Sequence, residues 1–336
     1  MKLYINIFTH LREKLFIKQL PDYYREKGII FKINSSEDRI WDFVVIYEDI
    51  DIEQTVSYKK GGLLFFSGEP PFVKVYSKKF LNQFDHIITS HSGSDKRNAT
   101  FYHKTQQSLP WYFGYGFKEK NINYSFEQLA NMIAPLKTKK ISFITSNREY
   151  LPGHASRLNL LKELQHRYNN EIDFFGKGIK DIDDKAEGLL PYQFSICIEN
   201  SNISDYWSEK IADAFLGYTI PVYFGCKNMD SYFPNDSYIP LNIKNISSVF
   251  AAIDELLSDS DELYQKYLPG VIEARKRLIY KYNLYPSIIS LTESIVLSEN
   301  IEKITLKPST IFHDVNLENK ILKIKRVITR YKDKYL

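Results

Sequence analysis

The 336-residue sequence has two cysteines, three methionines and no long apolar run. Two cysteines exclude a disulfide framework, and Cys197, which lies in an apolar stretch, is expected to be a buried, reduced thiol. No stretch approaches the roughly 20 apolar residues that would span a bilayer. Polar residues interrupt the first ten positions, where a signal peptide needs an apolar block, so we expect a cytoplasmic protein.

The chain has little net charge, because 45 lysines and arginines face 41 acidic residues. Residues 319–336 carry seven basic residues and one acidic residue, a net charge of +6 against +4 for the whole chain, so the preceding part is slightly acidic. A nucleic-acid partner is therefore not expected. With 43% hydrophobic and 26% charged residues, the composition is that of a globular protein. This composition excludes a chain that is disordered, collagen-like or a coiled coil over its whole length.

Short apolar runs alternate with longer stretches of helical periodicity along most of the chain. The runs are apolar on both faces, which is typical of parallel strands covered by helices on both sides. A polar hinge near residue 137 separates two such series. We expect an α/β fold of two Rossmann-like domains facing across a cleft, at residues 1–136 and 137–300, and a basic tail at 301–336.

The individual elements follow from the same pattern. Strands are predicted at residues 3–8, 29–33, 42–47, 62–66, 86–89, 141–145, 172–175, 192–198 and 220–224. Helices are predicted at residues 125–136, 155–167, 205–216, 246–257 and 260–282. From residue 319 the tail has the pattern of a basic amphipathic helix, which can lie on an anionic membrane or dock on the body of the protein.

Residues 192–225 carry the strongest chemical signal. They read as a strand, a polar turn, a helix capped by Ser204 or Asp205, and a second strand ending in glycine. Ligands of such sheets collect at the carboxyl ends of the strands, where a helix N-terminus offers N–H groups to an anion. The predicted helix carries Tyr206, Glu209 and Lys210 in its first turns. These groups suit a nucleotide diphosphate, and a solvated surface helix is the alternative.

Three motifs of this stretch resemble the donor-binding segment of the α1,3/4-fucosyltransferases, family ten of the glycosyltransferases. They are Glu199-Asn200-Ser201, Asp205-Tyr206-Trp207-Ser208-Glu209-Lys210 and Ile220-Pro221-Val222-Tyr223-Phe224-Gly225. Residues 232–239, residues 173–178, and Ser146-Asn147 followed by Arg157 resemble further parts of the same family. The resemblance is dense over residues 141–242 and thins to one short motif before residue 137.

The resemblance implies a GT-B type glycosyltransferase that moves L-fucose from GDP-fucose to a hydroxyl of an acceptor glycan with inversion. Arg157 and Lys210 would neutralise the departing diphosphate, which an arginine grips as a fork and a lysine as a point charge. Asn200, Tyr206 and Glu209 would hold the ribose, the phosphate or the sugar. Glu209 would also stabilise positive charge at the anomeric carbon. No cofactor and no essential metal ion are expected.

The first half of the chain offers one candidate, Glu69. It follows an apolar strand within Ser67-Gly68-Glu69 and precedes two prolines that prevent a helix from forming, so we expect it to point into the cleft. The segment resembles the Tyr-Thr/Ser-Gly-Glu segment of bacterial fucosyltransferases, whose glutamate is the proposed general base. An inverting transfer needs one such base, with a pKa raised by burial. A turn carboxylate in water is the alternative.

The acceptor cannot be identified from the sequence. An oligosaccharide or a lipid-linked glycan is expected, for example in O-antigen and lipopolysaccharide biosynthesis or protein glycosylation, with α1,3 linkage to GlcNAc or glucose. The basic tail would hold the enzyme at the inner face of the cytoplasmic membrane. Two alternatives remain open: another nucleotide-sugar donor, either a related GDP-deoxyhexose or a UDP-sugar, and a non-catalytic protein that binds a glycan or a nucleotide.

Three further features of the sequence are not assigned to a cofactor or metal site. The Gly176-Lys177-Gly178 segment has Asp181 where a dinucleotide fingerprint needs its third glycine, which argues against NAD. The acidic run at residues 181–184 is expected to be a solvated loop and not a metal site. The histidines at positions 86, 91 and 103 lack the spacing of zinc ligands.

Overall fold

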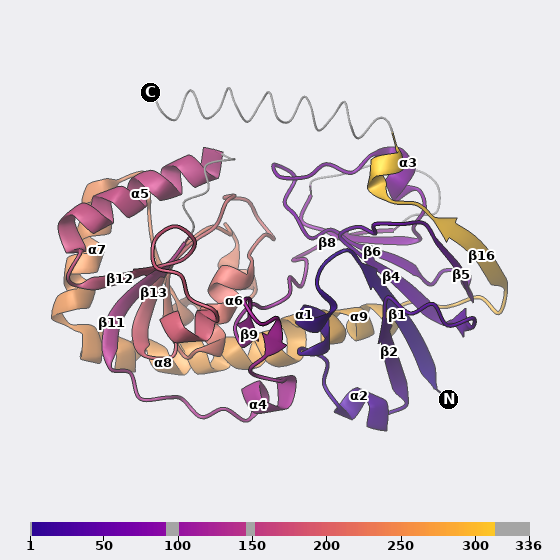
Figure 1. The fold of residues 1–336 in the computed structure, drawn as a ribbon, viewed down its shortest axis with the longest axis horizontal. Helices are drawn as coiled ribbons and strands as arrows, with labels where there is room; N and C mark the ends of the chain where they lie inside the picture. Colours follow the sequence, from indigo (N-terminus) through magenta and orange to yellow (C-terminus); the bar gives the residue numbers. More distant parts are fainter. Residues whose placement is uncertain (1, 92–100, 146–151, 313–336) are drawn as a thin grey trace. The chain divides into compact units, whose positions relative to one another are not determined.

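The computed structural model describes residues 2–91, 101–145 and 152–312 (Figure 1). In this part of the chain, residues 2–109 together with 284–312 form one compact unit, and residues 110–283 form another. Each unit is built on one main parallel sheet with helices packed on it. The predicted α/β class is confirmed.

The main sheet of the first unit has six parallel strands in the order β2-β1-β4-β6-β7-β8. The strands are β1 (Leu3–Thr9), β2 (Ile29–Ile33), β4 (Phe43–Tyr47), β6 (Leu63–Phe66), β7 (His86–Thr89) and β8 (Phe101–Lys104). Its helices are α1 (Glu13–Ile17), α2 (Tyr23–Glu26), α3 (Lys78–Leu81) and α9 (Leu284–Thr292). Every residue of β4, β6 and β7 is buried, as expected for strands covered on both faces.

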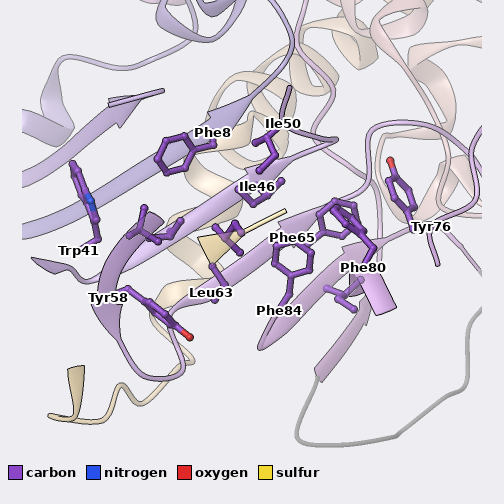
Figure 2. Packing of buried hydrophobic residues seen from close by; sticks show 14 residues of the cluster. Phe8, Trp41, Ile46, Ile50, Tyr58, Leu63, Phe65, Tyr76, Phe80 and Phe84 are labelled. Atoms are coloured by element: carbon purple, nitrogen blue, oxygen red, sulfur yellow. The ribbon is translucent and has the colours of Figure 1, made fainter. Parts of the chain in front are cut away.

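An aromatic cluster fixes the chain that follows β6 (Figure 2). The ring of Phe65 lies 4.8 Å from Tyr76, 5.3 Å from Phe80 and 5.0 Å from Phe84, measured between centroids. Such pairs contribute about 0.5–1.5 kcal/mol beyond the area they bury. The Ser77 hydroxyl caps α3 by accepting a hydrogen bond from the Phe80 N–H. Aromatic packing therefore joins β6 to the segment that follows the turn carrying Glu69.

A three-stranded sheet completes the first unit in the order β16-β5-β3. It contains β3 (Ile40–Trp41), β5 (Gln54–Lys59) and β16 (Ile301–Leu306), and β16 runs antiparallel to β5. Residues 301–306, which the sequence analysis assigned to the tail, are therefore a strand whose hydrogen-bonding partner lies far away in the sequence. The predicted amphipathic helix that starts at residue 319 lies outside the described residues.

The second unit contains five parallel strands in the order β12-β11-β13-β14-β15. These are β11 (Lys139–Ile144), β12 (Ile172–Phe175), β13 (Tyr192–Ile198), β14 (Ile220–Phe224) and β15 (Ile239–Pro240), with a short antiparallel pair, β9 (Tyr115–Gly116) and β10 (Asn121–Ile122). Its α-helices are α4 (Phe126–Ala130), α5 (Pro152–Tyr168), α6 (Glu209–Leu216), α7 (Ile246–Ser258) and α8 (Ser260–Arg277). A π-helical turn at Leu278–Tyr282 follows α8. Among the described residues, no helix combines the length and apolarity needed to cross a bilayer.

The second unit begins earlier than the hinge predicted near residue 137, because residues 110–136 pack on it. The buried Asp213 carboxylate accepts hydrogen bonds from the N–H groups of Tyr112 (3.0 Å) and Phe113 (2.9 Å). These long-range bonds leave no local pattern in the sequence. The helix predicted over residues 125–136 is also shorter than expected, since α4 ends at Ala130.

Candidate functional site

The candidate site of the second unit lies where β13 ends and α6 begins. The helix starts at Glu209, four residues after the predicted start at residue 205. Its cap is Ser208, whose hydroxyl accepts from the Lys210 N–H at 3.3 Å, and not Ser204 or Asp205. Asp205 has a left-handed backbone with φ +63°, which a helix cannot include. Tyr232 fixes it there by donating its hydroxyl hydrogen to Asp205 Oδ1 at 2.7 Å.

The later helix start changes the roles of two predicted helical residues. Tyr206 lies in the turn before α6 instead of in its first turn, and it is buried. Trp207 is also buried, with its ring 5.1 Å from Phe233 and 6.1 Å from Tyr282. The turn between β13 and α6 is therefore held by aromatic packing rather than by helical hydrogen bonds.

Glu199 joins the end of β13 to the start of α6. Its side chain is fully buried and accepts from the Ser208 N–H at 2.7 Å and from the Ser208 hydroxyl at 2.7 and 2.8 Å. A Cβ added to Gly225 would lie 2.4 Å from Glu199 Cγ and from the Tyr223 hydroxyl. The glycine that ends the third motif is therefore required because Glu199 occupies the space beside it.

Side-chain charges gather around this carboxylate in what we call the charged cluster. Its members are Arg157, Lys185, Glu199, Glu209, Lys210 and Asp213. Lys210 Nζ lies 3.2 Å from Glu199 Oε2 and 3.6 Å from Glu209 Oε1. Lys185 Nζ lies 3.6 Å from the same Glu209 oxygen and 2.8 Å from Asp213 Oδ2. Each carboxylate of α6 thus contacts at least one ammonium group.

Arg157 reaches the cluster from α5. It is only 5% exposed and donates from Nη1 to Asn200 Oδ1 at 3.0 Å. Burial lowers the pKa of its guanidinium, and the charges of Glu209 and Glu199 oppose that shift. The structure therefore brings together four of the five predicted donor-binding residues, Arg157, Asn200, Glu209 and Lys210. The fifth, Tyr206, lies in the turn between β13 and α6.

Two side chains of the cluster, Glu209 and Lys210, stay ionised despite their burial. Burial alone would keep Glu209 protonated, but Lys210 and Lys185 lower its pKa to about 2. Burial likewise disfavours the Lys210 ammonium, yet Glu199 and Glu209 raise its pKa above the ordinary value. At neutral pH both side chains are charged. An anion that enters here meets fixed cations, which is the property a phosphate site requires.

A pocket of about 320 Å³ opens beside the cluster at the carboxyl ends of β14 and β15. Gly225 belongs to its wall and also lies against Glu199, so the pocket and the cluster share a boundary. Tyr223, Tyr238 and Asn202 contribute aromatic and amide groups to the lining. A pocket at this edge of a parallel sheet, next to an anion site, suits an organic group attached to a phosphate.

Glu69 lies in the first unit, in the turn after β6, and is half-buried. The His91 ring donates from Nε2 to the Glu69 backbone carbonyl at 2.8 Å, although the sequence analysis assigned no role to this histidine. A Cβ on Gly68 would lie 1.8 Å from Glu48 Oε2, so the motif needs a glycine where the Glu48 carboxylate packs. The raised pKa expected for Glu69 stays a prediction.

The acidic run at residues 181–184 is not simply solvated. Asp184 is buried, caps the 3-10 turn Lys185–Gly188 and accepts from the Gly114 N–H at 2.9 Å. The run therefore has a structural role that the sequence analysis missed. Cys197 is a free, buried thiol, as expected, and burial raises its pKa to about 12. Across the described ranges, no group of three or more His, Cys, Asp or Glu side chains is arranged to hold a metal ion.

Comparison with known proteins identifies relatives of the second unit. Residues 134–276 match the family model described as glycosyltransferase family 10 (fucosyltransferase) C-term, and this range includes every member of the charged cluster. A human 4-galactosyl-N-acetylglucosaminide 3-alpha-L-fucosyltransferase 9 is 31% identical over 161 residues, 46% of this chain and 41% of the relative. The alpha-(1,3)-fucosyltransferase FucT of Helicobacter pylori is 28% identical over 210 residues, 59% of this chain and 39% of the relative.

The chain thus spans about two fifths of the length of these curated relatives. Among solved structures, an alpha-glucosyltransferase (AGT) in complex with UDP aligns with a TM-score of 0.51 and 9% identity over 87% of this chain and 99% of that one. An alpha1,3-fucosyltransferase solved with GDP-fucose aligns with a TM-score of 0.47 and 20% identity over 89% and 93% of the two chains. The first likeness agrees with the expected GT-B fold class.

Proposed function

We propose that this protein transfers L-fucose from GDP-fucose to a hydroxyl of a glycan, because residues 134–276 match the family model described as glycosyltransferase family 10 (fucosyltransferase) C-term. One observation carries the proposal. Arg157 and Lys210 lie beside Asn200 and Glu199 at the carboxyl end of β13, within the matched range, and the pocket adjoins them. A diphosphate with an attached sugar is the ligand that this arrangement fits best.

In this proposal Lys210 and Arg157 bind the two phosphates of the donor. Both side chains are already held by protein partners, Lys210 by Glu199 and Arg157 by Asn200, so little ordering is needed when the donor arrives. The transfer places growing negative charge on the departing GDP. Fixed cations at that point stabilise the transition state more than the ground state.

Glu209 is the acidic partner of the donor. It is ionised at neutral pH, because Lys210 and Lys185 lower its pKa to about 2. It can accept hydrogen bonds from ribose hydroxyls or oppose the positive charge that develops at the anomeric carbon. The pocket next to Gly225 would then receive the nucleoside or the sugar.

Glu69 is the general base of the proposed reaction. It takes the proton of the acceptor hydroxyl while the acceptor oxygen bonds to the anomeric carbon, and the bond from that carbon to the diphosphate oxygen breaks with its electron pair leaving on GDP. In-line attack inverts the anomeric centre. Side-chain cations supply the positive charge at the leaving group, so the proposal includes no metal ion.

Three assays test this function. Calorimetry with GDP and UDP identifies the nucleotide, and tight binding of UDP would favour another donor. Transfer from GDP-fucose to a panel of free and lipid-linked oligosaccharides identifies the acceptor, for which the names of the relatives suggest α1,3 linkage. Proton NMR of the product shows whether the anomeric centre is inverted. GDP binding without transfer to any glycan would point to a non-catalytic binding protein.

A cytoplasmic enzyme acting at the inner face of the membrane is part of the same proposal. Its support is the basic residues after position 319, which suit an anionic lipid surface. Sedimentation with vesicles containing anionic lipid should retain the full chain and lose a variant that ends at residue 318. Equal retention of both would exclude the tail as an anchor.

A further inference from the structure

We propose that Lys185 is a positioning residue of the donor site, which holds the Glu209 carboxylate in place and neutralises Asp213. The inference rests on the proposed function and adds a residue that lies in none of the three motifs. Lys185 comes from a different segment of the chain, the 3-10 turn that Asp184 caps.

The contacts of Lys185 are specific. Its ammonium lies 2.8 Å from Asp213 Oδ2 and 3.6 Å from Glu209 Oε1, and its side chain is only 18% exposed. The same ammonium lies 4.9 Å from the centre of the Tyr112 ring, a further favourable site for a cation. Buried lysines cost free energy unless their charge is matched, and here two carboxylates match it.

Glu209 and Asp213 need such a cation because they stand one turn apart on α6. Carboxylates four residues apart on a helix repel each other, and burial strengthens the repulsion. Lys185 lies between them and contacts both. Asp213 has no freedom to turn away, since its other oxygen accepts from the N–H groups of Tyr112 and Phe113. The position of Lys185 thus fixes the position of Glu209.

This arrangement also bears on Lys210, which the proposed function assigns as a phosphate ligand. Lys210 contacts both Glu199 and Glu209. Lys185 also contacts Glu209 and offsets part of its negative charge. The positive charge of Lys210 is therefore not fully offset by Glu199 and Glu209 together. Without Lys185, a donor that carries negative phosphates would face Glu209 and Asp213 with one cation fewer. The donor would bind more weakly, and Glu209 would hold its proton more tightly.

The test is the Lys185→Met variant, which keeps the length of the side chain and removes its charge. We expect the Kd for GDP to rise on the order of tenfold. The pKa of Glu209, followed by NMR titration of the glutamate side chains, should rise, because Glu209 loses one of the two cations that lower it. Lys185→Arg should restore both properties. A residue with a purely structural role would lower the stability and leave the pKa of Glu209 where it is.

Lys139→Met is the matched control. Lys139 also lies in the second unit and forms an ion pair with Asp173 at 2.8 Å, the same length as the pair of Lys185 with Asp213. The pair of Lys139 lies at the surface. This variant should bind GDP as the unchanged protein does. If Lys185→Met proves unstable, the double variant Lys185→Met/Asp213→Asn removes the unpaired acid and should fold. It should still show the raised pKa of Glu209.

NMR titration of the glutamate side chains separates the inference from the proposed function. The pKa of Glu209 should rise in Lys185→Met whether or not a nucleotide binds. If the unchanged protein failed to bind GDP while this rise was seen, the proposed donor would be wrong and the positioning of Glu209 would stand. An unchanged Glu209 titration, together with unchanged GDP affinity, would overturn the inference.

Discussion

The two regions that carry the proposed chemistry hold their carboxylates in different ways. In the second unit, Glu209 is held by the charges of Lys210 and Lys185, and Glu199 by Lys210 together with Ser208. In the first unit, the turn with Glu69 is held through its backbone, by His91 on the Glu69 carbonyl. Ionic contacts demand particular residue types at many positions, whereas backbone contacts demand few. The donor region therefore shows a long motif, and the turn with Glu69 shows a short one.

The largest effect should follow from Lys210→Ala. The change removes the proposed phosphate ligand and leaves the buried Glu199 without its cation, which typically costs about 3–5 kcal/mol of stability. Transfer should fall below detection, and calorimetry should show little GDP binding. The double variant Lys210→Ala/Glu199→Gln should regain stability in thermal unfolding without regaining GDP binding. Unchanged GDP affinity in the single variant would contradict the role of Lys210.

Glu69→Ala should separate the roles of the two regions, because it removes the proposed base and leaves the proposed donor site intact. We expect kcat to fall by about 10²–10⁴-fold, the usual contribution of a general base. The Kd for GDP should not change. Rapid-quench assays at saturating donor and calorimetry measure the two quantities. Turnover at the normal rate would show that another group takes the proton.

Two variants, Gly225→Ala and Gly68→Ala, compare how tightly a carboxylate side chain is held next to a glycine in each of the two regions. In Gly225→Ala the new Cβ would meet Glu199 Cγ, which Lys210 and Ser208 hold in place, so a cost of about 1–3 kcal/mol and weaker GDP binding are expected. In Gly68→Ala the new Cβ would meet the end of the Glu48 side chain, which can turn aside. Chemical denaturation should show the smaller loss for Gly68→Ala. A larger loss there would mean that Glu48 is as rigid as Glu199.

The sequence predicted the strands of both sheets better than the details of the site. Apolar runs such as Ile172–Phe175 and Tyr192–Ile198 are strands over the predicted residues, because burial on both faces leaves a continuous apolar signal. The start of α6 was placed too early. Asp205 is a good helix cap in general, but here Tyr232 holds it in a left-handed turn.

Long-range contacts account for what the sequence did not show. Lys185 joins the charged cluster only because the fold brings its turn beside α6, and no spacing in the sequence marks that approach. The pairing of β16 with β5 and the attachment of Tyr112 to Asp213 are hidden for the same reason. His91 could have been found by a local signal, since it follows the strand next to β6.

The smallest predicted effect is a pH dependence of the stability of the second unit. Glu209 has a pKa of about 2 in the folded protein, below its ordinary value of 4.5. The folded state therefore favours the ionised carboxylate, and this stabilisation is fully present above the ordinary value and is lost as the pH falls toward 2. Glu209→Gln cannot titrate, so its unfolding free energy should change less over that range. Urea titrations of the two proteins between pH 6 and pH 3 give the difference between their unfolding free energies. If both unfolding free energies changed equally with pH, Lys185 and Lys210 would not hold Glu209 as the structure describes.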